Sequence, residues 1–286
     1  MFYGWKVCSV SCLGNLLVVG GVTYIMNAFM EPMSTLHGWT RADIGGAVGL
    51  ATLCGTLSMP VLASLAMRYS LRLMTTLGMA CGGLAFMGLG YAGTLPSFTA
   101  LFALAWVAGQ ACGGVVGNAL MGNWFVRCRG RAFGLANLGT SLSGALLPFV
   151  ALVLVTLCDV RMAFLVIGGF ILALVPLCWA VVRDTPEELG LSSDGVPPLA
   201  SAAPISPIIV PWRNLLVCRE AYCIGLSFGF GLLAAAGVLG QLKPRFADLG
   251  FSDYAAMGFI CSRRAASTSG VGSATSKHRC SAPNSS

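Results

Sequence analysis

Few residues in this sequence have the type and spacing that enzyme chemistry requires. Cys8 and Cys12 lie four residues apart, so a helix would place both thiols on one face, where they could hold a metal ion. No histidine or acidic residue lies near them, and we favour a role as small hydrophobic residues. The sequence contains no HExxH or Walker-type glycine motif. We therefore expect a protein that is not an enzyme, with no catalytic residue, no cofactor and no metal site.

The polar residues that remain inside the apolar runs carry no charge. These residues are Tyr24, Asn27, Gln110, Asn118, Thr140, Ser141 and Ser143. Each could form a hydrogen bond between helices, and each could instead line a central polar cavity. We take Tyr24, Asn27, Gln110 and Asn118 as the candidate substrate-facing residues. Charged residues usually mark proton relays and ion sites within a membrane, and none lies in the middle of any run.

The composition identifies the class of protein. Of the 286 residues, 56% are hydrophobic and only 9% are charged, and the mean hydropathy is +0.81. A soluble domain carries about 25% charged residues. So few charges exclude a soluble enzyme, a nucleic-acid-binding module and a disordered protein. The net charge of +7 does not alter this, because the basic residues are scattered between apolar runs and are not clustered.

The apolar runs are long enough to cross a bilayer as helices, since about 20 helical residues span the hydrocarbon core. The uncharged runs are 7–30, 44–67, 73–126, 132–158, 162–182 and 221–242. The third run is too long for one crossing, and the Gly- and Pro-containing segment 90–97 divides it. The sequence thus predicts an all-α polytopic membrane protein with seven spans. Alanine and glycine at four-residue spacing (Ala105, Gly109, Gly113 and Gly117, with Gly45/Gly49 and Gly78/Gly82) predict close helix packing.

The distribution of basic residues predicts the orientation. With the N-terminus in the cytoplasm, nine Lys and Arg residues fall on the cytoplasmic side and four on the outer side. Two helix starts are also indicated: Thr40 with Asp43, and Thr185 with Glu188, each have the spacing of a capping box. The second predicts a short surface helix after the sixth span.

The chain divides into four parts. We expect an N-terminal six-helix bundle over residues 1–183, a cytoplasmic linker over 184–217, and helix seven with the start of helix eight over 218–260. Residues 261–286 contain no Leu, Ile, Phe, Met, Trp or Tyr. Such a segment cannot cross a membrane, and it is either a shifted or truncated reading frame or a natural disordered tail.

Three loop sequences together carry a family resemblance. They read GWTRADI at 38–44, WFVRCRGRAFG at 124–134 and RDTPEELGL at 183–191, and GVTY at 21–24 fits the same branch. Over residues 1 to about 260 the chain resembles the major facilitator superfamily, within its monocarboxylate transporter and oxalate–formate antiporter branch. In the loop 63–72, both arginines of the family pattern are present as Arg68 and Arg72, while Ala63, Met67 and Ser70 replace its Gly, Asp and Gly.

The resemblance implies two six-helix bundles around a site near the membrane midplane. It implies secondary active transport of a small organic anion by alternating access, with a coupled proton or counter-anion, and we expect this chain to be an incomplete form of such a carrier, truncated after the seventh helix. It also implies gating loops that contain Arg68 and Arg72 between the second and third spans, and Arg127 and Arg131 between the fourth and fifth. The implied location is a cell (plasma or inner) membrane.

The alternative is a membrane protein that does not transport, either an inert truncated product or a helix-packing partner. The partners expected are the lipid bilayer and the anion, without nucleic acid, and self-association is possible for the incomplete second bundle.

Because alternating access needs two bundles, we expect that the 286 residues alone, reconstituted in liposomes, show no saturable uptake of oxalate, formate, lactate or pyruvate.

The orientation yields a testable prediction. A variant that keeps Cys128 as its sole cysteine should react with an impermeant thiol reagent in sealed inside-out vesicles and not in right-side-out vesicles, because the basic residues hold that loop in the cytoplasm. By the same reasoning, a cysteine introduced at His37 should react from the outside. Preferential labelling of Cys128 in right-side-out vesicles would contradict this orientation.

Overall fold

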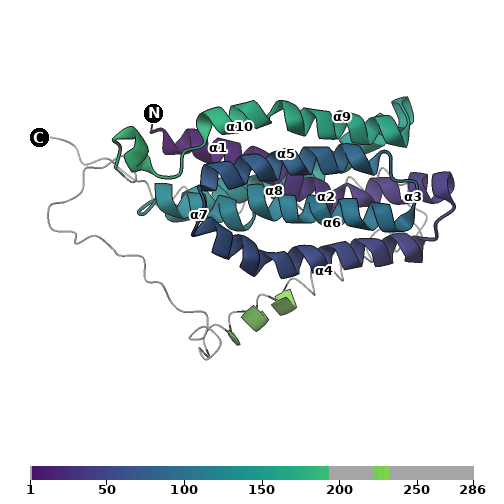
Figure 1. The fold of residues 1–286 in the computed structure, drawn as a ribbon, viewed down its shortest axis with the longest axis horizontal. Coiled ribbons are helices and arrows are strands. Elements are labelled where there is room, and N and C mark those ends of the chain that lie inside the picture. The colour runs from purple at the N-terminus through teal and green to yellow at the C-terminus, as the bar shows by residue number, and fades with distance from the viewer. Residues whose placement is uncertain (1, 193–218, 220–221, 224, 228, 232–286) are drawn as a thin grey trace, which may run out of the picture. The chain divides into compact units, whose positions relative to one another are not determined.

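The computed structural model describes residues 2–192, 219, 222–223, 225–227 and 229–231 (Figure 1). The first stretch belongs to one compact unit, and the remaining described residues belong to a second. The residues described between 219 and 231 are helical, where the seventh span is predicted. The rest of that span, the linker beyond 192, the start of helix eight and the tail from Cys261 lie outside the described residues.

Within residues 2–192 the chain is predominantly helical, and no strand occurs there. The elements are α1 (Gly4–Gly14), the π-helix η1 (Asn15–Val19), α2 (Gly20–Tyr24), α3 (Met26–His37), α4 (Arg41–Ala66), α5 (Leu71–Leu89), α6 (Leu95–Cys112), α7 (Val115–Trp124), α8 (Arg129–Leu157), α9 (Val160–Ala173), α10 (Val175–Val181) and the 3-10 helix η2 (Pro186–Leu189). In the described part of the chain, six helical segments have the length and hydropathy of membrane spans. The prediction of an all-α polytopic membrane protein is confirmed.

The six spans form a bundle in which neighbours along the chain run in opposite directions. α6 packs against both α4 and α5, α5 packs against α9, and α1 with η1 and α2 packs along α8 (Figure 1). We call the end with the turns 38–40, 90–94 and 158–159 the His37 end. The opposite end, with the turns 67–70 and 125–128 and residues 182–185, is the Tyr3 end.

Helix boundaries follow the sequence signals in most places. The capping box at Thr40 is confirmed, since the Asp43 amide donates to Thr40 Oγ1 at 3.2 Å and the Thr40 amide donates to the Asp43 carboxylate at 3.0 Å. The division near residue 90 is confirmed by the end of α5 and the start of α6. The second capping box is wrong, because Thr185 makes no capping hydrogen bond, but the short helix predicted after the sixth span is present as η2, which begins at Pro186.

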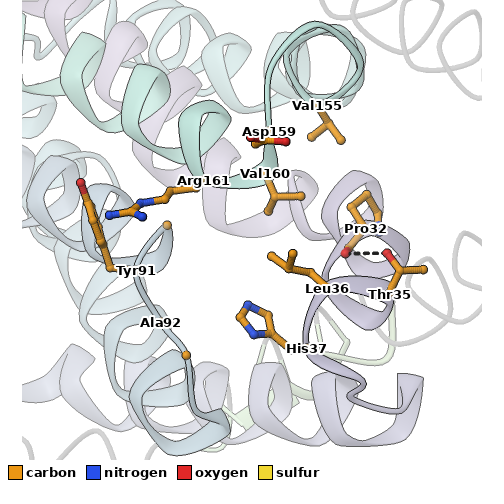
Figure 2. Close-up of a pocket in the computed structure, with 12 residues that line it drawn as sticks. Pro32, Thr35, Leu36, His37, Tyr91, Ala92, Val155, Asp159, Val160 and Arg161 are labelled. Atoms are coloured by element: carbon orange, nitrogen blue, oxygen red, sulfur yellow. Dashed lines mark hydrogen bonds between the residues drawn. The ribbon is translucent and has the colours of Figure 1, made fainter.

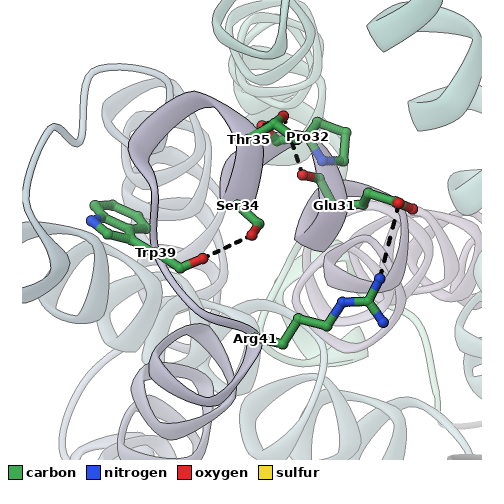
Figure 3. A network of polar contacts seen from close by, with 6 residues as sticks. All are labelled: Glu31, Pro32, Ser34, Thr35, Trp39 and Arg41. Carbon is green, nitrogen blue, oxygen red and sulfur yellow. Dashed lines mark hydrogen bonds and ion pairs between the residues drawn. The ribbon is translucent and has the colours of Figure 1, made fainter.

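Polar contacts surround the turn between α3 and α4 (Figure 3). Ser34 Oγ donates to the Trp39 carbonyl oxygen at 2.8 Å, which closes the turn at Gly38, a residue in the left-handed region with φ 69°. Arg41 and Glu31 form an ion pair at 3.9 Å with both side chains about three-quarters exposed, at 74% and 76%. So exposed a pair contributes little to stability.

The glycine pattern predicts packing correctly in two of three places. A Cβ on Gly78 would lie 2.9 Å from the Cys112 amide nitrogen, and one on Gly82 would lie 2.8 Å from Val18 Cγ1, so these glycines allow α5 to approach its neighbours. Gly109 likewise faces Val19 of η1. By contrast, a Cβ on Gly45 or Gly49 would meet no described atom within 4 Å, so the packing prediction is wrong for this pair within the described residues.

α1 comes very close to α8 at Gly139. A Cβ at this position would overlap the Cys12 carbonyl oxygen and would lie 3.1 Å from the Leu16 amide nitrogen. The obstacles are backbone atoms, so they cannot turn aside as a flexible side chain would. Replacing Gly139 must therefore push the first span away from the fifth.

This contact predicts that Gly139→Ala destabilises the bundle by about 1–3 kcal/mol, the usual cost of overpacking. The expected result is a lower melting temperature of the purified protein in detergent, followed by tryptophan fluorescence. Gly169→Ala on α9 is the matched control, because a Cβ there meets no described atom within 4 Å. Equal melting temperatures for the two variants would show that the α1–α8 approach does not depend on a bare backbone.

Candidate functional site

The first and fourth spans are both interrupted, and at the same level of the bundle. In the first span, the Gly20 amide donates to the Asn15 carbonyl oxygen five residues back, which is the π-helical pattern. In the fourth span, α6 ends at Cys112 and α7 begins at Val115. There the amides of Gly113 and Gly114 both donate to the Gly109 carbonyl oxygen, at 3.0 and 3.1 Å.

Asn15 connects the two interruptions to a third span. Its side chain is buried, with 3% exposed, and its Nδ2 donates to the Ala136 carbonyl oxygen of α8 at 3.0 Å. Its Oδ1 lies against Gly113, where a Cβ would overlap it. Gly113 is therefore needed here for the close approach of Asn15, and one amide side chain touches the first, fourth and fifth spans together.

Three further buried polar residues lie around Asn15, and we call the four of them the mid-bundle polar cluster. The members are Ser11, Asn15, Gln110 and Ser143. Gln110 Oε1 lies against Gly114, and Ser143 Oγ donates to the Thr140 carbonyl oxygen at 2.7 Å and lies against Gly20. Ser11 Oγ is buried and has no hydrogen-bond partner among the described residues. A buried hydroxyl of this kind costs free energy unless it finds a partner.

The four candidate substrate-facing residues are placed differently from one another. Gln110 belongs to the mid-bundle polar cluster. Tyr24 is half-buried at the end of α2, and Asn118 is half-buried in α7. Asn27 lies in the first turn of α3, and its side chain is outside the described part. The sequence analysis overlooked Ser11 and Asn15, although both are polar residues inside the first apolar run.

The Tyr3 end is organised around residues 179–184, which include the end of the sixth span. Arg72, expected in a gating loop, donates from Nε to the Trp179 carbonyl oxygen at 2.9 Å and stacks its guanidinium over the Trp179 ring at 4.0 Å. Its backbone amide donates to the Asp184 carboxylate at 2.6 Å. Asp184 thus accepts a hydrogen bond from an amide at the N-terminus of α5, where the helix dipole favours a negative charge.

Two more spans hold the same segment. Tyr3 Oη donates to the Val181 carbonyl oxygen at 2.9 Å, and Trp124 Nε1 donates to the Arg183 carbonyl oxygen at 2.9 Å. Asn123 Nδ2 donates to the Asp184 carbonyl oxygen at 3.3 Å. The chain therefore leaves the sixth span fixed to the first, third and fourth spans. The sequence showed the motif at 183–191 but gave no sign of these partners.

The other arginines expected in gating loops also lie at the Tyr3 end. Arg68 is exposed in the turn between α4 and α5. Arg127 is exposed in the turn before α8, and Arg131 is half-buried in the first turn of α8. All four arginines are thus on one side of the bundle, which is the side that the predicted orientation assigns to the cytoplasm.

The cysteine pair of α1 is part of the helix packing. The Cys8 thiol donates to the Ala132 carbonyl oxygen of α8 at 3.4 Å. Among the described residues, no three side chains of His, Cys, Asp or Glu come together in a way that could hold a metal ion. The arrangement of Cys8 and Cys12 gives a contact between the first and fifth spans.

Comparison with known proteins identifies the family. The family model described as Major Facilitator Superfamily matches residues 12–278, which includes the six spans described above, apart from the start of the first, and the segment 183–191. No curated protein matches the chain. The match covers far more than half of the sequence and agrees with the loop resemblance. The chain therefore belongs to the Major Facilitator Superfamily.

Proposed function

We propose that the protein is a secondary active transporter of a small organic anion of the monocarboxylate or oxalate/formate type. Its family supports transport across a membrane. The proposal adds the substrate class, alternating access, coupling to a proton or counter-anion, and a cytoplasmic N-terminus in a cell membrane. The loop sequences at 38–44, 124–134 and 183–191 favour this branch of the family.

The observation that supports the site is the paired interruption of the first and fourth spans. Irregular backbone at membrane depth is tolerated only where it is buried in protein or lines a cavity, and π-type turns within helices are frequent at functional sites. Here the two interruptions meet at Asn15 and Gly113, beside Gln110. We therefore place one wall of the substrate site next to the mid-bundle polar cluster.

The chemistry of this wall suits a small anion of low charge. The candidate substrate-facing side chains of the first and fourth spans offer uncharged donors, the amides of Gln110 and Asn118 and the hydroxyl of Tyr24. Uncharged donors can hydrogen-bond a carboxylate, and such bonds to a charged acceptor are stronger than neutral ones. They also avoid the cost of burying a cation in the membrane when no substrate is bound.

The anion class predicts saturable binding of labelled oxalate, formate, lactate or pyruvate to the purified chain in lipid nanodiscs, measured by scintillation proximity. Other small carboxylates should displace the label, while a neutral sugar and an organic cation should not. Displacement by the sugar or the cation would overturn the anion class. If none of the four anions binds, the alternative of a membrane protein that does not transport is favoured.

The wall itself is tested by Gln110→Leu and Asn118→Leu in the same binding assay. Each should weaken anion binding by about tenfold, the effect of losing one hydrogen bond to a charged group. Asn137→Leu is the matched control, because this exposed amide donates to the Phe133 carbonyl oxygen of its own helix at 2.9 Å. Equal affinity in the Gln110, Asn118 and Asn137 variants would show that the first two amides serve helix packing alone.

A further inference from the structure

A cavity lies at the His37 end, away from the mid-bundle polar cluster. Its volume is about 820 Å³, and it is bounded by α3, the turn between α5 and α6, and the turn between α8 and α9 (Figure 2). Nothing in the proposed transport mechanism uses it. Its walls nevertheless contain both a cation and an anion, which is uncommon in a chain with only 9% charged residues.

The two charges are Asp159 and Arg161, which stand at the start of α9 and line the cavity (Figure 2). Asp159 and Arg161 form no ion pair with each other in the part of the chain that the structure describes; the ion pair found there joins Arg41 to Glu31. Asp159 is the N-cap residue of α9, yet its side chain makes no capping hydrogen bond. Its carboxylate therefore does not cap the helix, which is the usual role of an aspartate at this position.

The position of Arg161 is fixed by an aromatic ring. Its guanidinium stacks over Tyr91 at 3.9 Å from the ring centre. The ring covers one face of the guanidinium and fixes its orientation, while the N–H groups at its edge remain available to a ligand. A Cβ on Gly90 would lie 2.9 Å from the Arg161 carbonyl oxygen, so the backbone of the two turns is also in close contact. The cation is thus held against a rigid support.

The remaining wall is mostly apolar. Leu36, Val155 and Val160 line it, and His37, which also lines the cavity, stacks on Trp39 with 4.5 Å between ring centres. Aromatic side chains such as Trp39 and Tyr91 are enriched where a membrane protein meets the boundary between lipid and water. A ligand for this cavity should therefore combine opposite charges with a hydrocarbon part.

We propose that this cavity binds a zwitterionic group that carries a primary ammonium and a phosphate or carboxylate. Arg161 contacts the anionic part through its free N–H edge, Asp159 accepts hydrogen bonds from the ammonium, and the apolar wall contacts the adjoining carbon chain. A lipid with an ethanolamine head group and a free zwitterion such as O-phosphoethanolamine share this chemistry.

Native mass spectrometry of the purified chain tests the proposal, with phosphatidylethanolamine, phosphatidylcholine and phosphatidylglycerol added in equal amounts. We expect phosphatidylethanolamine to bind in preference, since choline has no N–H to donate and glycerol carries no cation. Arg161→Gln and Asp159→Asn should each lower that occupancy by about tenfold. Both side chains are exposed, so neither change should prevent folding, which the melting temperature verifies.

The exposed pair supplies matched controls, because Arg41→Gln and Glu31→Gln remove the same charges at the same end but outside the cavity. Their occupancy should equal that of the unaltered chain. Saturable binding of O-phosphoethanolamine without lipid would assign the site to a free zwitterion, and binding of the lipid alone would assign it to the membrane. Equal occupancy by all three lipids without O-phosphoethanolamine binding, or equal losses in the cavity and control variants, would overturn the proposal.

Discussion

The bundle depends on satisfying backbone polar groups where no water can reach them. A peptide group without a partner costs several kcal/mol in hydrocarbon, so a membrane helix can depart from regular geometry only where protein supplies replacement contacts. The interruption of the first span occurs where Asn15 donates to the Ala136 carbonyl oxygen, and the interruption of the fourth span lies against the same side chain. The amides of Gly20, Gly113 and Gly114 find carbonyl partners within their own spans, and the buried side chain of Asn15 packs between the two irregular helices.

The remaining packing accommodates this contact. α1 can reach α8 because Gly139 has no side chain, and η1 can reach α6 because Gly109 and Gly113 have none. α5 then closes over the same region through Gly78 and Gly82. At the Tyr3 end, hydrogen bonds from Tyr3, Arg72 and Trp124 fix the segment that leaves the sixth span. The bundle therefore combines apolar helix contacts in the middle with polar connections at its end.

The sequence predicted the six spans of this bundle because hydropathy and length depend only on local composition. It also predicted the start of α4, since Thr40 and Asp43 interact within one turn. It could not predict the interruptions, because Gly113 in a row of small residues reads equally well as a packing position in a straight helix. The residue that Gly113 contacts at the interruption is Asn15, which lies nearly a hundred positions earlier in the chain. The partners of Arg72 could not be predicted for the same reason, because Trp179 and Asp184 are distant from it in sequence.

The hydrogen bonds of the two interruptions have a consequence for helical phase. Gly20 bonds to Asn15 and Gly114 bonds to Gly109, so each helix accommodates one residue more than a regular turn at this level. Since one residue corresponds to about 100° of rotation, a single helical wheel drawn through either span assigns wrong faces to the residues beyond the break. Deleting one residue at either position would turn the half that follows by about 100° toward a different neighbour, and in the fourth span that half includes Asn118. Because the two spans run in opposite directions, the half that follows the break lies toward the His37 end in the first span and toward the Tyr3 end in the fourth.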